Sequence, residues 1–193
     1  MRLFAAVLPP DEAVAELGPA VDQLRDTEGA EGLRWTGRPG WHFTLAFYGE
    51  VPDETVPELS RRLARAAGRT APFPLALHGG GHFGDRALWA GASGDVAALR
   101  RLAERAGAAA RKAGLPAEEH RKEHTHYRPH LTLARGSGAV HLKPYAAALD
   151  TFTGEQWTVG ELALVRSRLP TSGVRGEQPR YEKVGGWPLS GTG

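Results

Sequence analysis

Cysteine is absent from the 193-residue chain. Its absence excludes disulfides, zinc sites built on thiolates and a cysteine nucleophile, and it is compatible with a reducing compartment. Uninterrupted apolar runs of about 18 residues are also missing, so the sequence predicts no membrane span. Charge of one sign is barely in excess, because 24 Lys and Arg face 22 Asp and Glu for a net charge of +2. Charge alone therefore does not identify a nucleic-acid-binding protein.

The composition that remains is typical of a globular protein, with 41% hydrophobic and 24% charged residues. The length suits a single domain, residues 1–193, or two small lobes that share one core. The apolar run 3–8 predicts a buried first strand and not a signal peptide, because charge returns at Asp11 and no cleavage site follows. We therefore expect a cytoplasmic protein.

Hydrophobic periodicity predicts an alternation of strands and helices. Strands are expected over 3–8, 42–48, 73–77, 87–90, 130–134, 158–168 and 180–184. Helices are expected over 11–26, 53–68 and 95–114, with Asp53 as a cap and with Gly18-Pro19 kinking or splitting the first helix. Loops are expected over 27–40, 116–129 and 170–179, and a glycine-rich turn over 79–84.

The chain contains an internal echo. Segment 42–46 reads HFTLA and segment 130–134 reads HLTLA, 88 residues apart. Each copy follows a loop and has the alternation of a strand. The echo predicts two related αβ halves that face each other across a cleft, each contributing one copy.

Polar residues of each copy share one strand face, because side chains two apart on a strand point the same way. His42 lies with Thr44, and His130 lies with Thr132. The apolar residues between and after them, Phe43, Leu45 and Phe47 in the first copy and Leu131 and Leu133 in the second, are expected on the opposite, core-facing side.

Two imidazoles and two hydroxyls in one cleft suit the hydrolysis of a phosphodiester. A neutral imidazole can take a proton from water and an imidazolium can give one to the leaving oxygen, since the ordinary pKa of histidine is about 6.5. Threonine hydroxyls can donate hydrogen bonds to the phosphate oxygens. A single H-x-T is most often a structural pair, but two matching copies favour a shared site. The pattern itself leaves open which histidine is the acid.

H-F-T-L and H-L-T-L resemble the paired H-x-T-x signature of the two-histidine phosphoesterase superfamily. Five further strings are similar to its bacterial and archaeal RNA 2′,3′-cyclic phosphodiesterase branch, formerly called 2′–5′ RNA ligases. They are RLFAAVLPP, HFTLAFYGEV, GHFGDRALWAG, YRPHLTLAR and the closing SRL…G…YEKVGGWPL. The similarity spans nearly the whole chain in the expected order.

This resemblance implies an α+β fold with two pseudo-symmetric αβ lobes, approximately 1–95 and 96–193, whose antiparallel sheets flank a central cleft with one motif per lobe. Members open a terminal ribose 2′,3′-cyclic phosphate to a 2′-phosphate without a metal or another cofactor. Some also join RNA ends through a 2′–5′ bond in a weak reverse reaction. We accordingly expect RNA ends as the partner, no membrane, and a monomer.

Carried over to this chain, the resemblance makes His42 the proton donor to the departing 3′ oxygen and His130 the base that activates water. Thr44 and Thr132 would hold the phosphate. Arg135 matches a family arginine that contacts phosphate, although strict alternation puts it on the face away from the histidines.

Phe47 or Tyr48 is a candidate for stacking on a base, because an aromatic face accepts any nucleobase. The simpler interpretation of Phe47 is a core residue, as the alternation along its strand predicts.

Other patterns point elsewhere. Segment 79–84, GGGHFG, has the spacing G-x-G-x-x-G, but strand-like residues follow it, which favours a hairpin turn over a dinucleotide site. His120, Glu123 and His124 match H-x-x-E-H, with His126 nearby, so a zinc hydrolase is a rival class, although Pro116 and dense charge disfavour the required helix. A phosphodiesterase for small cyclic nucleotides and a non-catalytic RNA-binding protein also remain open.

Overall fold

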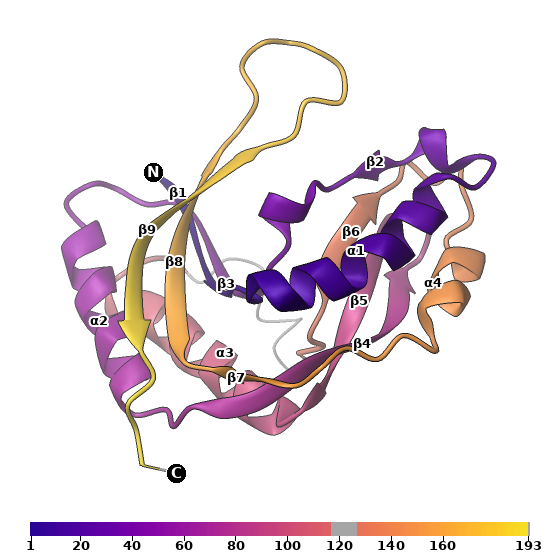
Figure 1. Cartoon of the computed structure of the whole chain (residues 1–193). Coiled ribbons are helices and arrows are strands. Elements are labelled where there is room, and N and C mark those ends of the chain that lie inside the picture. The colour runs from indigo at the N-terminus through magenta and orange to yellow at the C-terminus, as the bar shows by residue number, and fades with distance from the viewer. Residues whose placement is uncertain (117–126, 193) are drawn as a thin grey trace.

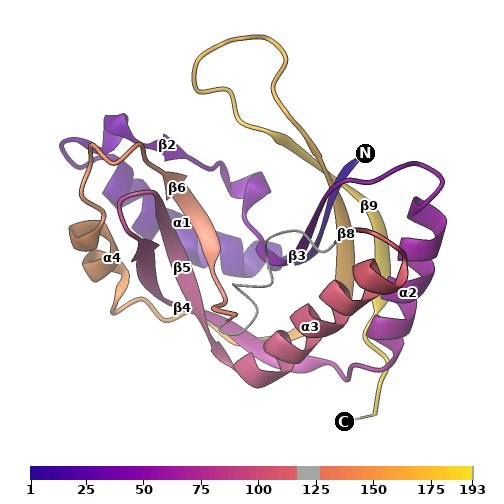
Figure 2. The same cartoon turned by 180° about the vertical axis from the view of Figure 1, so that it is seen from behind.

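A single antiparallel sheet organises the chain in the computed structural model, which describes residues 1–116 and 127–192 (Figures 1 and 2). The strand order is β7-β4-β5-β6-β3-β1-β8-β9, and β2 pairs with β6 beside this path. The strands are β1 (Arg2–Val7), β2 (Arg34–Trp35), β3 (Phe43–Glu50), β4 (Phe73–Phe83), β5 (Ala87–Gly94), β6 (Leu131–Arg135), β7 (Trp157–Val159), β8 (Glu161–Arg168) and β9 (Arg180–Pro188). The predicted α+β class is confirmed.

Helices cover each half of this sheet. They are α1 (Asp11–Arg25), α2 (Val56–Gly68), α3 (Val96–Lys112) and α4 (Lys143–Leu149), with short 3-10 turns η1 (Ala30–Gly32) and η2 (Arg38–Gly40). α2 and α3 pack together against the half built from β1, β3, β8 and β9, and α1 and α4 lie on the half built from β4, β5 and β6 (Figures 1 and 2). Within the described residues, no helix combines the length and apolarity needed to cross a membrane.

The sequence predicted that the first helix would kink or split at Gly18-Pro19, but the helix does not split there. α1 continues through Pro19 to Arg25, because one apolar face (Ala13, Leu17, Val21 and Leu24) stays buried along its whole length. At Gly18 the guanidinium of Arg38 lies close to the helix backbone, since a Cβ there would be 2.3 Å from the guanidinium carbon. That guanidinium in turn donates to Asp22 of the helix at 2.8 Å.

The ends of the other elements follow local chemistry. Asp95 caps α3 as predicted for that helix start, since its carboxylate accepts from the Ala98 N–H at 3.0 Å, and Gly114 ends it with φ +82°. Asp53 was predicted to cap α2, which is wrong: residues 53–55 form a turn, and the helix begins after Thr55.

Three short or interrupted elements were predicted incorrectly. Segment 79–84 is not a turn, because β4 continues to Phe83, but it does lie in a β-hairpin with β5 and not between a strand and a helix. The strand expected over 158–168 is broken at Gly160 into β7 and β8. The seven-residue helix α4 was missed.

The strand order interleaves the two halves of the sequence. β8 and β9 lie beside β1, and β6 lies between β5 and β3. A boundary between lobes at residue 95 therefore has no counterpart in the strand order, and the division of the single domain into lobes 1–95 and 96–193 stays a prediction.

Candidate active site

The two H-x-T copies meet where β3 and β6 pair. The pair is antiparallel and joins Phe43 to Leu131, both of which are fully buried. Continuing this register by one residue in each direction sets His42 opposite Thr132, and Thr44 opposite the second histidine, His130. Opposite residues of an antiparallel pair share one face. The four predicted polar residues therefore line the same face, as the sequence pattern requires.

Spacing across this face suits a phosphate group. In the extended register the two histidines are diagonal neighbours, and such residues lie about 7–8 Å apart in an antiparallel pair. A separation of this size along the backbone is compatible with two imidazoles that flank one phosphate group. Both rings are partly exposed and neither is lost in the core.

Matching backbone hydrogen bonds orient both rings. Nδ1 of His42 lies 2.7 Å from the carbonyl of Gly40, and Nδ1 of His130 lies 2.9 Å from the carbonyl of Arg128. A carbonyl only accepts, so Nδ1 carries the proton in each neutral ring and Nε2 is left with the lone pair. In His42 that lone pair faces the Thr44 hydroxyl at 3.0 Å.

Two aromatic side chains pack against the His42 ring. Phe4 stacks on it at 4.6 Å between centroids, and Tyr181 meets it edge-on at 5.4 Å. Sequence reasoning missed both, because they come from β1 and β9, and nothing local in either strand marks them as neighbours of the first motif.

A second aromatic wall stands beside His130. Phe83 lies edge-on at 4.9 Å and Trp89 lies at 6.1 Å. Trp89 is opposite both Gly81 and Thr132 in the sheet. A Cβ at Gly81 would come within 2.2 Å of the indole, so the glycine that resembled part of a dinucleotide motif instead makes room for this ring.

Burial keeps His42 uncharged. Burial lowers the pKa of His42 from 6.5 to about 4, and the charges of His130 and Arg135 contribute to the lowering, while the hydrogen bond to Gly40 opposes it. The ring is therefore neutral at neutral pH. The effect of Arg135 also places its guanidinium near this site.

A register shift explains how Arg135 reaches that face. Between Leu88 and Trp89 of β5 the partner strand β6 advances by two residues, from Ala134 to Thr132, and leaves Leu133 as an extra residue. A bulge of this kind breaks the alternation, so strict alternation gave the wrong face for Arg135. Burial raises the pKa of Tyr181, and the charge of Arg135 acts in the opposite direction, which again puts the arginine at the cleft.

The same shift corrects the predictions for the two aromatic residues of β3. Opposite Ala5 and Ala6 of β1, β3 advances from Ala46 to Thr44. Phe47 was expected on the core face, but it packs instead with Phe4 in the small cluster beside His42, partly exposed and 4.7 Å from the guanidinium of Arg2.

Tyr48, the other stacking candidate, is buried and only 5% exposed. Its hydroxyl donates to the carbonyl of Ala106 in α3 at 3.0 Å. Its ring therefore cannot reach a base, and Phe47 is left as the candidate for stacking.

The rival zinc motif of His120, Glu123, His124 and His126 falls outside the described residues. Among residues that are described, no group of three or more His, Asp or Glu is arranged to hold a metal ion.

Comparisons with known proteins agree on the family to which the chain is similar. A family model described as the 2'-5' RNA ligase superfamily matches residues 9–170. A Thermus thermophilus protein named RNA 2',3'-cyclic phosphodiesterase is 34% identical over 96% of this chain and 96% of its own length. A Geobacillus stearothermophilus protein of the same name is 30% identical over 82% of this chain, which spans only 48% of that longer relative.

Solved structures show the same architecture. The crystal structure of TT0787 from Thermus thermophilus superposes with a TM-score of 0.75 at 30% identity and covers 99% of both chains. Escherichia coli LigT complexed with 3'-AMP superposes with a TM-score of 0.70 at 27% identity, covering 98% of this chain and 97% of its own. The resemblance drawn from the sequence is thus confirmed at the level of family and fold.

Removing the His42 imidazole should make the free energy of unfolding depend less on pH between about 4 and 6.5. The folded pKa of about 4 lies below the ordinary 6.5, so the unfolded chain binds more protons between these values, and stability is lost as pH falls through that window. We expect His42→Gln to remove up to about 3 kcal/mol of this loss, less where the ring meets solvent.

Urea unfolding at a series of pH values from 4 to 7 measures the effect. His78→Gln is the control, because that exposed ring bonds Thr153 outside the cleft. Parallel curves for wild type and His42→Gln would contradict the prediction.

Proposed function

The chain belongs to the 2'-5' RNA ligase superfamily, and on this basis we propose that it is a metal-independent RNA 2′,3′-cyclic phosphodiesterase. The observation that carries the proposal is the pairing of β3 with β6, which puts two histidines and two threonines on one face. Relatives named RNA 2',3'-cyclic phosphodiesterase support the choice of substrate.

In the proposed reaction, His130 takes a proton from a water molecule through Nε2. The water oxygen bonds to phosphorus, the bond from phosphorus to the 3′ oxygen breaks, and His42 gives that oxygen a proton. The product carries a 2′-phosphate and a free 3′-hydroxyl, and the proton moves from His130 back to His42 through solvent. Thr44 and Thr132 donate hydrogen bonds to the non-bridging oxygens, where charge is held in the transition state.

Substrate binding supplies the charge state that this mechanism needs. Burial, with smaller contributions from His130 and Arg135, holds the pKa of His42 down before the substrate binds. A bound phosphodiester anion reverses the local field, because an adjacent opposite charge favours the protonated form of an imidazole. His42 thus gains its proton together with the substrate, and Arg135 adds a positive charge beside the phosphate.

Three further features of the proposal follow from the site. A 5′-hydroxyl in place of water would give the weak 2′–5′ joining of RNA ends. Phe47 is the surface on which the terminal base stacks. Both motifs come from one chain, which supports a monomer, and size-exclusion chromatography tests this. The proposal also includes a cytoplasmic protein that acts on RNA ends away from membranes.

Product analysis is the direct test of the activity. An RNA oligonucleotide ending in a 2′,3′-cyclic phosphate should be converted to a 2′-phosphate end, and the rate should persist in excess EDTA because imidazoles supply both the acid and the base. Mass spectrometry and phosphatase sensitivity identify the end group. A 3′-phosphate product, or activity that returns only with added zinc, would point to other chemistry.

The losses of kcat on replacing His42 and His130 should not be additive, because the two histidines act in the same reaction step. His42→Ala and His130→Ala should each lower kcat by about 10²–10⁴, the usual worth of one positioned proton transfer, and the double variant should be little slower than either. Single-turnover rates measure this, with His141→Ala as a control on a histidine that pairs with Asp85. If the two losses multiply, the residues act independently.

The pH profiles should differ between the free and the bound state. kcat/KM reports the free protein and kcat the complex. Because the pKa of His42 is about 4 before the substrate binds while His130 must be neutral, only a small fraction of the free protein has the active charge state. The alkaline fall of kcat/KM should therefore begin at lower pH than the alkaline fall of kcat. Coinciding profiles would show that the substrate does not change the charge of His42.

A further inference from the structure

We propose that the RNA strand leading to the cyclic phosphate runs through an arginine-lined groove beside the histidines, so that the preferred substrate is an RNA strand of several nucleotides and not a cyclic mononucleotide. This inference rests on the proposed function. The groove has a volume of about 1070 Å³, larger than the roughly 300–1,000 Å³ of small-molecule sites.

The groove has two walls. One is formed by β2 and the end of β6, and the other by the long loop between β8 and β9, which projects from the molecule in Figure 1. Five arginines line it, against one acidic side chain, Glu31: Arg25, Arg34, Arg86, Arg135 and Arg175. All five are exposed.

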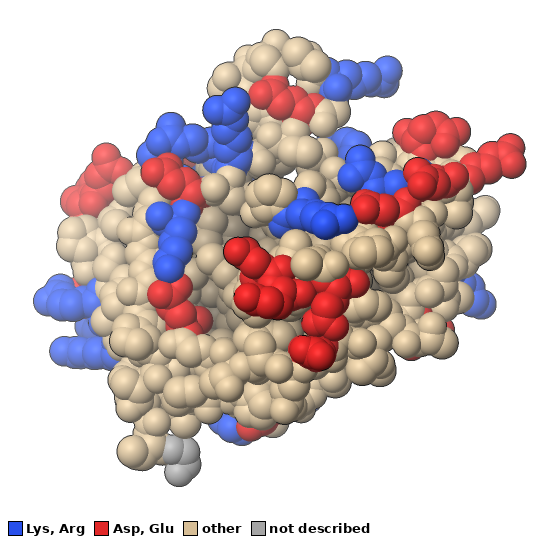
Figure 3. Space-filling view, viewed as in Figure 1, with Lys and Arg blue, Asp and Glu red and all other residues tan. Residues whose placement is uncertain are grey.

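In the part of the chain that the structure describes, no carboxylate forms an ion pair with any of the five. The whole chain has nearly balanced charge, with 24 basic and 22 acidic residues, so the groove is a local concentration of positive charge. In Figure 3, Asp and Glu cluster over α1, whereas Lys and Arg lie beside acidic residues around β2 and η2.

One pair of arginines lies where packing alone would not put it. Arg34 of β2 is directly opposite Arg135 of β6, and like charges opposite each other destabilise a sheet. An anion between the two guanidinium groups removes that repulsion. A chain of phosphates is the ligand that suits several such groups in a row, because guanidinium binds phosphate in a bidentate manner.

Arg135 links the groove to the reacting end. Its charge lowers the pKa of His42, and it lines the groove together with Arg34. A strand whose terminal phosphate lies between the histidines therefore continues past Arg135 into the groove. Trp35, partly exposed, with the Arg25 guanidinium 6.0 Å from its ring centre, offers a face for a base along this path.

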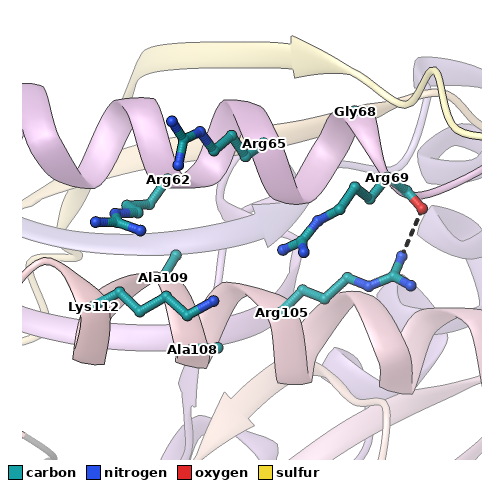
Figure 4. A pocket seen from close by; sticks show the side chains of 8 residues that line it. All are labelled: Arg62, Arg65, Gly68, Arg69, Arg105, Ala108, Ala109 and Lys112. Atoms are coloured by element: carbon teal, nitrogen blue, oxygen red, sulfur yellow. Dashed lines mark hydrogen bonds between the residues drawn. The ribbon is translucent and has the colours of Figure 1, made fainter.

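The test compares two substrates and two charge-matched variants. The first variant is Arg34→Ala/Arg86→Ala/Arg175→Ala. The second is Arg65→Ala/Arg69→Ala/Lys112→Ala, which removes three exposed cations from a separate basic pocket of about 380 Å³ between α2 and α3 (Figure 4). Each loses three positive charges, so a general effect of net charge would appear in both.

We expect wild type to have a lower KM for an eight-nucleotide RNA ending in a 2′,3′-cyclic phosphate than for a 2′,3′-cyclic mononucleotide. The groove variant should raise KM for the RNA about tenfold or more, and should change that for the mononucleotide far less, because the lost contacts are to phosphates along the strand. The α2–α3 variant should match wild type. Equal KM values for both substrates in wild type, or equal losses in the two variants, would overturn the inference.

Binding without turnover separates this inference from the proposed function. Fluorescence anisotropy with a labelled RNA ending in a 2′-phosphate should give a log–log salt slope shallower by about 2 in the groove variant, since single strands lose about 0.7 per phosphate contact. Tight binding of the RNA with no hydrolysis of either substrate would contradict the proposed phosphodiesterase activity and support the groove as an RNA-binding surface. Hydrolysis of the mononucleotide with no affinity for the RNA strand would support the activity and contradict the groove as an RNA-binding surface.

A folding control accompanies these assays. Arg34→Ala alone should leave the thermal midpoint unchanged or raise it, because it removes a repulsion with Arg135. A lower midpoint would show that Arg34 serves the fold, and would count against the groove as a binding surface.

Discussion

The pairing of Phe43 with Leu131 is the constraint on which the site depends. Both side chains are fully buried, so each strand has one register in which its apolar residues reach the core, and a slip of one residue would turn the polar set inward. The hydroxyl of Tyr127 supports the same junction, since it donates to the carbonyl of Thr44 at 2.9 Å. Core packing thereby decides how far apart the two imidazoles lie, although neither ring belongs to the core.

A β-bulge occurs at the same place in both H-x-T strands, and it brings a different kind of side chain to the histidine face in each. Leu45 in β3 and Leu133 in β6 are the extra residues at equivalent places in the strings HFTLAF and HLTLAR. After each bulge the next side chain to reach the histidine face is Phe47 in one strand and Arg135 in the other. The same backbone device therefore presents an aromatic side chain from one strand and a positive charge from the other on the face that carries the histidines.

The sequence predicted the elements that bury a regular apolar face, and it predicted the four polar residues of the two motifs, because an H-x-T repeat on alternating strands needs only local geometry. It could not predict the face of Phe47 or Arg135, since a bulge depends on the neighbouring strand. It could not find Phe4, Tyr181 or Trp89 either, because their place beside the histidines follows from the strand order. The continuity of α1 through Pro19 likewise depends on tertiary packing, which outweighs the loss of one backbone donor.

Electrostatics connect the small site to the larger groove. Arg135 lies near His42 and opposite Arg34, an arrangement that costs stability and helps to keep His42 uncharged. A polyanion removes both effects at once, because it screens the two guanidinium groups and restores the affinity of the imidazole for a proton. Since proteins depart from the rules of stability mainly at functional sites, we infer one explanation for the Arg34–Arg135 pair and the lowered pKa of His42: a cleft whose acid is completed by its substrate.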